Sequence, residues 1–573
     1  MCAASPHRGT LIESITLGGT ALACSNADDR PDAFIAEGEG LAVAFVGTID
    51  NASDLASALR LGASPPSGPS LPELLIAAAR AFGPELPARL RGVFAGAITD
   101  GTTVTCFRDH LGYRPLFHRT DEHGFFAASE AKQVVAGAGI RKEPDLDVVR
   151  RILFNATDDE MPSALRGVRR LPKSSCLRVR DGRSTQWRYW DPASLLETAR
   201  YSRDELQERF DALMDQAVTR CMTGPDILSL SGGIDSPAIA AFAAPRHLER
   251  YGEPLHAATV TYPRYPTVDE RRYVEPLAAA FGMPLHLYEQ QANALADVGQ
   301  WVTLTDGPYR SAALAQYAED YGRAVALGLP NVLTGEHAEF VAGLQWFRFD
   351  HLVTHGRFRA ARSELRERRA TGRSLVDQAR FIARSLAPAR VMDVRRSLGR
   401  SSTGRVPAWI DERAVDWGSR PSPRERWRRL QLTAFIGPGI SLEAEEVCQA
   451  VSGARSRKPW TDVDLWELFL SLRAEQKFPD RQPKGLVRRL LRGNVPDAIL
   501  DRTDKTVFDE AGLAEIDYPT LRRYLVQPGH RMAGVDYRAL QRRIEAQDLS
   551  VIEYGWARTL CTVQAFLAQW EPT

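Results

Sequence analysis

Near its middle the chain reads Ser231-Gly232-Gly233-Ile234-Asp235-Ser236, directly after the apolar residues 227–230. The apolar run predicts a buried strand, and the apolar residues 238–242 predict a helix just behind the turn. Glycines let a backbone approach a ligand closely, and the first N–H groups of a helix attract an anion. The turn therefore predicts a cradle for pyrophosphate, with Asp235 placed to hold a divalent metal on the phosphates.

The turn differs from two common nucleotide-binding motifs. It lacks the Gly-Lys-Ser/Thr of a Walker loop, and its glycines do not follow the dinucleotide spacing G-x-G-x-x-G. A plain helix N-cap is the alternative role for Asp235. The adjacent glycines favour the phosphate site.

Composition limits the class of protein. A length of 573 residues allows two or three domains, and the apolar share of 44% and charged share of 25% are ordinary for a soluble globular chain. A net charge of +1 provides no overall field to attract nucleic acid or a membrane. The seven cysteines form no C-x-x-C pair, and no run of 18 apolar residues occurs, so we expect a cytoplasmic protein without a disulfide framework.

The pattern of predicted elements divides the chain in two. Short strands at 41–47, 92–98 and 103–107 are interleaved with helices at 71–82 and 145–154, which predicts a layered α+β domain over residues 1–195. From about residue 200 to 573, helices alternate with strands. That alternation predicts a parallel sheet with ligands at its strand ends.

A helical insertion is expected at about residues 344–430. Five of its apolar side chains recur at helical spacing and are expected to pack on the core of the second domain: Leu365, Val376, Phe381, Ile382 and Leu386. The insertion is rich in arginine, at Arg357, Arg359, Arg362, Arg366, Arg368, Arg369, Arg373, Arg424, Arg426, Arg428 and Arg429. These side chains form either a solvated face or a clamp for peptide carboxylates. A nucleic-acid clamp is disfavoured because acids balance the arginines across the chain.

Several motifs in order resemble the asparagine synthetase superfamily. They are 89–95, 107–116, the turn at 231–236, the loop 334–339 (Thr-Gly-Glu-His-Ala-Glu) and 458–462, together spanning nearly the whole chain. The resemblance implies a glutaminase-like, Ntn-type first domain. It also implies an α/β ATP-pyrophosphatase second domain of the adenine nucleotide hydrolase-like type. Such enzymes cleave ATP between its α and β phosphates and transfer AMP to a carboxylate.

The first domain departs from the pattern of an active glutaminase. Cys2 supplies the thiol that such enzymes expose at a processed N-terminus. Ala3 and Ala4 replace the glycine and strand that should follow, and the N-G-E position reads Val-Gly-Thr at 46–48. No R-G-P-D loop is found, and the position of the glutamine-gripping aspartate falls near Leu71. We therefore expect that ammonia production is lost and that the attacking amine belongs to the substrate.

The resemblance also implies residue roles. ATP and pyrophosphate binding is assigned to Leu230, Ser231, Gly232, Gly233, Asp235, Ser236, Val260, Thr261, Gly335 and Lys484. Asp235 and Glu339 are the expected Mg²⁺ ligands, with glutamate where the family usually has aspartate. Glu336 is the expected base for the attacking amine, and Lys505 the cation that stabilises the acyl-adenylate and leaving pyrophosphate.

Simpler roles compete with some of these assignments. Glu336 could be a surface acid, and Lys484 and Lys505 could be solvated side chains. The Asp269–Glu270 pair could be merely two acids at the start of a helix. His337 replaces a glycine of the usual loop, and we expect it to shape the substrate pocket.

The leading hypothesis is an ATP-dependent lasso peptide cyclase that acts on a linear core peptide. A partner protease and a leader-binding protein would supply that peptide, and neither nucleic acid nor a membrane is expected as a partner. The alternatives are a β-lactam or carbapenam-type synthetase, a glutamine-hydrolysing asparagine synthetase, and a non-catalytic relative of the same fold.

Overall fold

The structure is a computed structural model that describes residues 1–27, 32–61, 69–310, 313–370, 372–388, 406–415, 421–437, 439–502, 506 and 509–570. Lys505 lies outside these ranges. Within them, no helix is both long and apolar enough to cross a membrane.

The first domain is built on a six-stranded antiparallel sheet. Its order is β11-β10-β6-β5-β4-β3, with β3 at Ala33–Gly38, β4 at Leu41–Gly47, β5 at Phe94–Thr99, β6 at Thr103–Arg108, β10 at Ser175–Arg180 and β11 at Arg183–Arg188. A three-stranded sheet (β8 Gly124–Ala128, β7 Phe117–Asp121, β9 Arg169–Arg170) and a hairpin (β1 Leu11–Leu17, β2 Thr20–Asn26) complete its strands.

Alternating side chains explain the layers of this domain. Val43 and Phe45 of β4 join the core beneath α2 (Leu71–Phe82), whereas Val46, one residue on, packs on the opposite face. Helix α4 (Ala131–Ala138) contacts β7 and β8. Helix, sheet, sheet and helix therefore follow one another, which confirms the layered α+β prediction.

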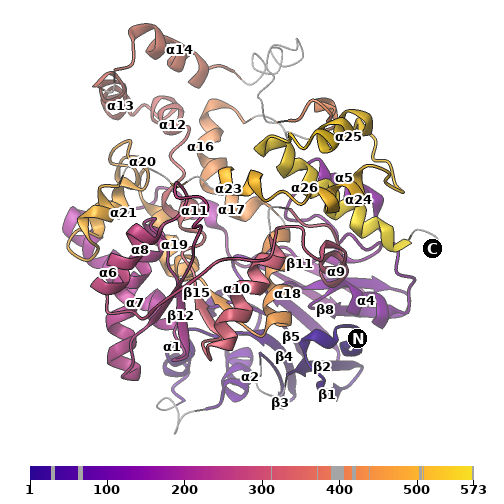
Figure 1. Cartoon of the computed structure of the whole chain (residues 1–573). Coiled ribbons are helices and arrows are strands. Elements are labelled where there is room, and N and C mark those ends of the chain that lie inside the picture. Colours follow the sequence, from indigo (N-terminus) through magenta and orange to yellow (C-terminus); the bar gives the residue numbers. More distant parts are fainter. Residues whose placement is uncertain are drawn as a thin grey trace.

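The second domain contains a five-stranded parallel sheet of order β14-β13-β12-β15-β16. Its strands are β12 (Asp226–Ser229), β13 (His256–Val260), β14 (Leu285–Tyr288), β15 (Asn331–Leu333) and β16 (Arg455–Arg457). They are connected or flanked by the helices α6 (Arg203–Cys221), α7 (Asp235–Tyr251), α8 (Arg271–Ala280) and α10 (Leu314–Ala326) (Figure 1). The chain moves outward from β12 through β13 to β14, then returns to the other side of β12 for β15. This reversal opens a crevice at the carboxyl ends of β12 and β15.

The insertion forms the helices α12 (Arg348–Thr354), α13 (Phe358–Ala370), α14 (Leu375–Ser385) and α16 (Pro423–Gln431). Helices α13 and α14 extend from the body at the top of Figure 1. Leu365, Phe381 and Ile382 pack against a cluster that includes Phe478 of the second domain. The expectation for Val376 was wrong: its side chain is 58% exposed, because α14 projects from the body and leaves that side of the helix uncovered.

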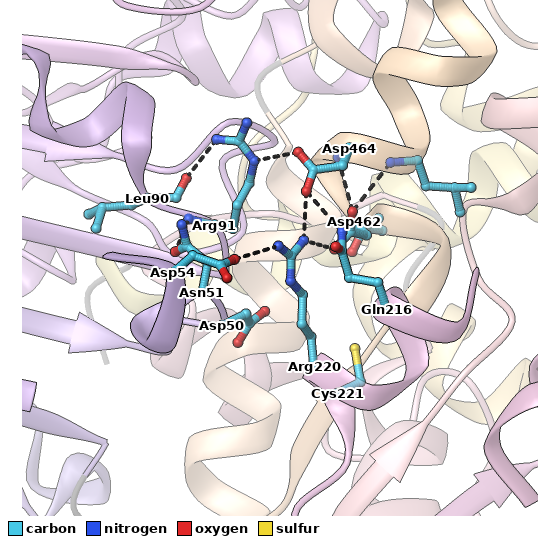
Figure 2. Close-up of polar contacts among 12 residues, drawn as sticks. Asp50, Asn51, Asp54, Leu90, Arg91, Gln216, Arg220, Cys221, Asp462 and Asp464 are labelled. Carbon is cyan, nitrogen blue, oxygen red and sulfur yellow. Dashed lines mark hydrogen bonds and ion pairs between the residues drawn. The ribbon is translucent and has the colours of Figure 1, made fainter. Parts of the chain in front are cut away.

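Charged side chains join the two domains (Figure 2). Arg220 of α6 reaches Asp462 and Asp464, each at 2.8 Å, and Arg91 of the first domain binds Asp464 at 2.7 Å. Asp464 therefore bridges one arginine from each domain. This network fixes the first domain against the start of helix α19 (Val463–Ser471).

Candidate active site

The turn after β12 holds its amides against side-chain oxygens. The N–H of Ser231 donates to Oγ of Ser236 at 2.8 Å, and the N–H of Gly232 donates to Oε2 of Glu270 at 3.0 Å. The N–H of Gly233, an exposed residue, reaches Oγ of Ser231 at 3.4 Å. Three backbone N–H groups of the turn therefore point to oxygen acceptors, and the oxygens of a phosphate are acceptors of the same kind.

Gly335 brings the end of β15 against this turn. A Cβ on Gly335 would lie 2.8 Å from the N of Ser236 and 3.0 Å from the carbonyl carbon of Asp235. A larger residue there would separate the loop after β15 from the start of α7. The glycine therefore allows the two strand-end loops to meet.

A cleft of about 360 Å³ opens where these loops meet. Its walls include six of the residues assigned from the sequence: Ser231, Asp235, Ser236, Gly335, Glu336 and Glu339. Leu230 instead is buried beneath the turn, and the hydroxyl of Thr261 bonds the carbonyl of Tyr288 at 3.2 Å. Val260 ends β13. These three, like Gly232, Gly233 and Lys484, are not among the residues that line the cleft in the described part of the chain.

Lys484 contacts both carboxylate oxygens of Asp235 through its ammonium group. It immediately precedes α21 (Gly485–Leu490), and Trp460 fixes the other side of Asp235 by donating its indole N–H to the backbone carbonyl at 3.0 Å. The structure thus places Lys484 against Asp235, a residue of the cleft wall, whereas sequence reasoning gave it only a generic phosphate role.

The donor set suits Mg²⁺. Asp235 and Glu339 both line the cleft, and no cluster of three or more His, Cys, Asp or Glu side chains able to hold a metal is found in the described ranges. Mg²⁺ in nucleotide sites typically takes one or two carboxylates, with phosphate oxygens and waters completing its shell. The residues present fit that pattern.

Glu336 does not stand alone in the cleft. Its Oε2 pairs with the ammonium of Lys458 at 2.8 Å, and the same ammonium lies 2.5 Å from Oε1 of Glu445. The hydroxyl of Tyr321 donates to that oxygen of Glu445 at 2.7 Å. Glu336, whose side chain is 39% exposed, therefore belongs to a charged group that also contains Lys458 and Glu445.

Glu270 supports the turn from below. Its Oε1 accepts from Arg502 at 3.2 Å and from the hydroxyl of Thr506 at 2.7 Å, and Arg502 also donates to the carbonyl of Gly232 at 2.7 Å. Asp269 instead pairs with Arg271 at 3.0 Å. Of the two acids, Glu270 is the one tied to the turn at 231–236, directly through the N–H of Gly232 and also through Arg502.

His337 has a backbone φ of 71°, which explains why glycine suits this position. Its ring packs edge-on against Tyr113, with centroids 5.5 Å apart. Burial, with the nearby Lys458 charge, lowers the pKa of His337 to about 3, so the ring is neutral at working pH. It serves as an apolar wall between the two domains.

Comparison with known proteins agrees with this architecture. The sequence pattern of the asparagine synthase family matches residues 209–571, well over half of the chain, and that of a glutamine amidotransferase domain matches residues 6–190. The chain belongs to the asparagine synthase family. Members of this family are ATP-dependent amide-forming ligases that release AMP and pyrophosphate, and that is the chemistry of this chain.

Three relatives named as asparagine synthetases illustrate the match. Asparagine synthetase [glutamine-hydrolyzing] 3 of Bacillus subtilis is 25% identical over 82% of this chain and 76% of its own length. A putative glutamine-hydrolyzing asparagine synthetase of Mycobacterium bovis is 27% identical over 75% of this chain and 69% of its own length. Asparagine synthetase B of Escherichia coli is 27% identical over 47% of this chain and 46% of its own length.

The amidotransferase domain of this asparagine synthase family member contains a pocket of about 340 Å³ beside Cys2. Its charged side chains are engaged with one another: Arg8 pairs with Glu446 at 2.6 Å and also with Glu130, Arg114 pairs with Glu446, and Asp32 pairs with Arg455. In the described part of the chain, each charged side chain lining this pocket already has an ionic partner. Small apolar side chains supply much of the remaining wall.

Helix α18 (Ile440–Ser452) was not singled out from the sequence. It carries three buried glutamates: Glu443 pairs with Arg108 and Arg170, Glu446 with Arg8 and Arg114, and Glu445 with Lys458. The partners of Glu443 and Glu446 belong to the first domain, and Lys458, the partner of Glu445, also contacts Glu336 in the cleft. The helix therefore connects the amidotransferase domain to the ligase site.

Proposed function

We propose that the chain is a lasso-type peptide cyclase, which joins a side-chain carboxylate of a linear peptide to the peptide's own N-terminal amine. The observation that carries this proposal is the pairing of charges in the Cys2 pocket. A free glutamine brings an α-carboxylate and an α-ammonium that need partners. The described side chains of that pocket use their charges on each other, so the amine is best supplied by the substrate.

The first step transfers AMP to the peptide. A carboxylate oxygen of an Asp or Glu side chain attacks the α-phosphorus of ATP, and the bond to the β-phosphate breaks to release pyrophosphate. Ser231 and Ser236, which line the cleft, bind the phosphates together with Gly233 of the same turn. Lys484, which contacts Asp235, moves from that carboxylate onto phosphate oxygens. Asp235 and Glu339 would hold Mg²⁺, which would neutralise phosphate charge there. We assign Lys505 to the same charge, since its neighbours Arg502 and Thr506 contact the turn or Glu270.

The second step forms the amide. Glu336 takes a proton from the peptide's N-terminal ammonium, and the freed nitrogen attacks the acyl-adenylate carbonyl. The C–N bond forms, the bond from the acyl carbon to the AMP oxygen breaks, and a second nitrogen proton leaves for solvent. The cleft must exclude water, because water would hydrolyse the adenylate.

The insertion supplies contacts for a peptide. Arg357 and Arg426 are structural, since they pair with Glu197 at 2.7 Å and with Asp350 at 3.1 Å. Other arginines of α13, α14 and the loop between them are exposed: Arg359, Arg362, Arg366, Arg369, Arg373, Arg380 and Arg384. Arginine binds carboxylates through two parallel hydrogen bonds. We assign these side chains to carboxylates of the peptide or of the proteins that deliver it, a protease and a leader-binding protein.

A glutamine-hydrolysing asparagine synthetase is the second candidate. It is favoured by the names of the relatives and by Cys2, which lines the pocket of the first domain. A β-lactam-type synthetase would use the same two steps on a small molecule. Both reactions, like cyclisation, consume ATP. We assign the protein to the cytoplasm, because a reducing compartment would keep all seven cysteines free, as they are in this structure.

Pyrophosphate release distinguishes the candidates. The purified chain is incubated with Mg²⁺ and ATP, together with either aspartate and glutamine or a series of linear peptides. The peptides carry an Asp or Glu at different distances from the N-terminus. We expect release with a peptide, accompanied by a product lighter by one water. Turnover with aspartate and glutamine alone, lost in Cys2→Ala, would establish the second candidate instead.

A further inference from the structure

Lys458 is an unusual residue for its surroundings. It is 5% exposed, lies directly before Pro459 at the end of β16, and places its ammonium between Glu336 and Glu445. Burying an ammonium is costly unless carboxylates surround it. Burial lowers the pKa of Lys458, but the two carboxylates outweigh that effect and raise it above its ordinary value, so the side chain stays charged.

The second carboxylate is held firmly on its far side. Glu445 is buried in α18 and accepts from the hydroxyl of Tyr321 at 2.7 Å as well as from Lys458. The Lys458 ammonium also lies 5.6 Å from the ring centre of Tyr113. Lys458 thus contacts Tyr113 of the first domain and Glu445 of α18, which Tyr321 of α10 holds in turn, and its contact with Glu336 reaches the cleft.

The net charge of Glu336, Lys458 and Glu445 favours the binding of one more cation. Two carboxylates against one ammonium leave a single negative charge, and the side chain of Glu336, 39% exposed, is the member that lines the cleft. A substrate ammonium arriving at Glu336 would balance the group. Without Lys458 the same pocket would carry two negative charges and would hold the ammonium too strongly to deprotonate it.

From this geometry we infer that Lys458 is a positioning residue for the amide-forming step, which orients Glu336 and balances its charge so that it can accept a proton from a substrate ammonium. The adenylation step, at Asp235 and Lys484, does not involve this group. The inference rests on the role proposed for Glu336, whatever the carboxylate substrate.

The test separates the two half-reactions. Carboxylate-dependent exchange of radiolabelled pyrophosphate into ATP reports adenylation, and mass spectrometry of the product reports amide formation. For Lys458→Met we expect exchange within about 3-fold of wild type and amide formation lowered about 10- to 100-fold, the scale typical of losing a residue that supports an active group. Lys458→Arg, which keeps the charge, should recover part of the loss.

A matched control guards against a purely structural effect. Lys477 is also buried, at 3% exposed, but donates to Gln431 at 2.8 Å rather than to a cleft carboxylate. Lys477→Met should affect both half-reactions equally. Equal losses of exchange and amide formation in Lys458→Met, or no loss of amide formation, would overturn the inference.

The substrates for this test are those with which the wild-type protein supports pyrophosphate exchange. If only aspartate supports exchange, the cyclase proposal fails, and the same ratio is then measured with aspartate and ammonium chloride. Failure of the proposed function is therefore seen in the wild type, whereas failure of the Lys458 inference is seen in the variant's ratio of the two half-reactions.

Discussion

The ammonium of Lys484 contacts both carboxylate oxygens of Asp235, the first residue of the helix behind the phosphate turn. In this arrangement the charge that would bind phosphate and the charge that would bind a metal neutralise each other. With ATP bound, Asp235 would hold Mg²⁺ and Lys484 would bind a phosphate oxygen. The pair therefore holds the two groups together at the start of α7.

Replacement of Asp235 should remove adenylation. Asp235→Asn keeps the side-chain shape but removes the charge that would hold Mg²⁺, so pyrophosphate release should fall at least about 100-fold. In the wild type, EDTA should abolish release and excess Mg²⁺ should restore it. Asp215→Asn, which breaks a surface pair with Arg246, is the control. Normal release from Asp235→Asn would show that the metal assignment is wrong.

A methyl group at Gly335 should disturb the meeting of the two strand-end loops. Its Cβ would lie 2.8 Å from the N of Ser236, so Gly335→Ala must push the loops apart. We expect the KM for ATP to rise about 10-fold and stability to fall by about 1–3 kcal/mol. Gly322→Ala, in helix α10 with no atom near its added Cβ, should leave both unchanged or raise stability slightly.

Arg502 should matter through the turn that it supports. It donates to the carbonyl of Gly232 and to Glu270, so Arg502→Met should loosen the turn and raise the KM for ATP about 10-fold while the fold persists. The control is Arg271→Met, one residue beyond Glu270, because the partly exposed side chain of Arg271 pairs with Asp269 and not with the turn. A KM equal to that of wild type in Arg502→Met would argue against this support.

Elements with a local signal were predictable from the sequence. Helix α2 has the predicted bounds because Ser70 and Glu73 form a capping box at its start, and both residues are readable in the chain. The turn at 231–236 was predictable for the same kind of reason: an apolar strand, small residues and a helix follow one another within a short segment.

The charged groups around the site could not be predicted in this way. Glu443 meets Arg108 across 335 residues of sequence, and Glu446 meets Arg8 across 438. From the sequence alone, the three glutamates of α18 would be predicted to form a solvated face. Only the folded structure shows that arginines of the first domain cover two of them. The prediction that Val376 is buried was wrong for the reverse reason: its helical spacing suggests burial, but its helix projects into solvent.

Loss of Arg220 should weaken the junction between the domains. It would leave Asp462 and Asp464 without their shared cation, and Arg91 contacts only the second of them (Figure 2). Arg220→Met should lower the free energy of unfolding by about 2–3 kcal/mol in urea titrations. Arg413→Met, which breaks a surface pair with Asp411, should change it by about 0.5 kcal/mol or less. Equal effects of the two substitutions would contradict the proposed role of Arg220.

Glu197 should give stability a measurable dependence on pH. Burial raises the pKa of this carboxyl, but hydrogen bonds from His351, Arg357 and the N–H of Ala474 outweigh it and lower the pKa to about 2. Because this folded-state pKa lies below the ordinary value of about 4.5, the stabilisation is complete above that value and disappears as pH falls toward 2. The wild type should therefore exceed Glu197→Gln in thermal stability at pH 7, and the gap should narrow steadily from pH 5 to pH 3. A gap that stays constant over that range would mean that the ionised carboxylate is not the stabilising form.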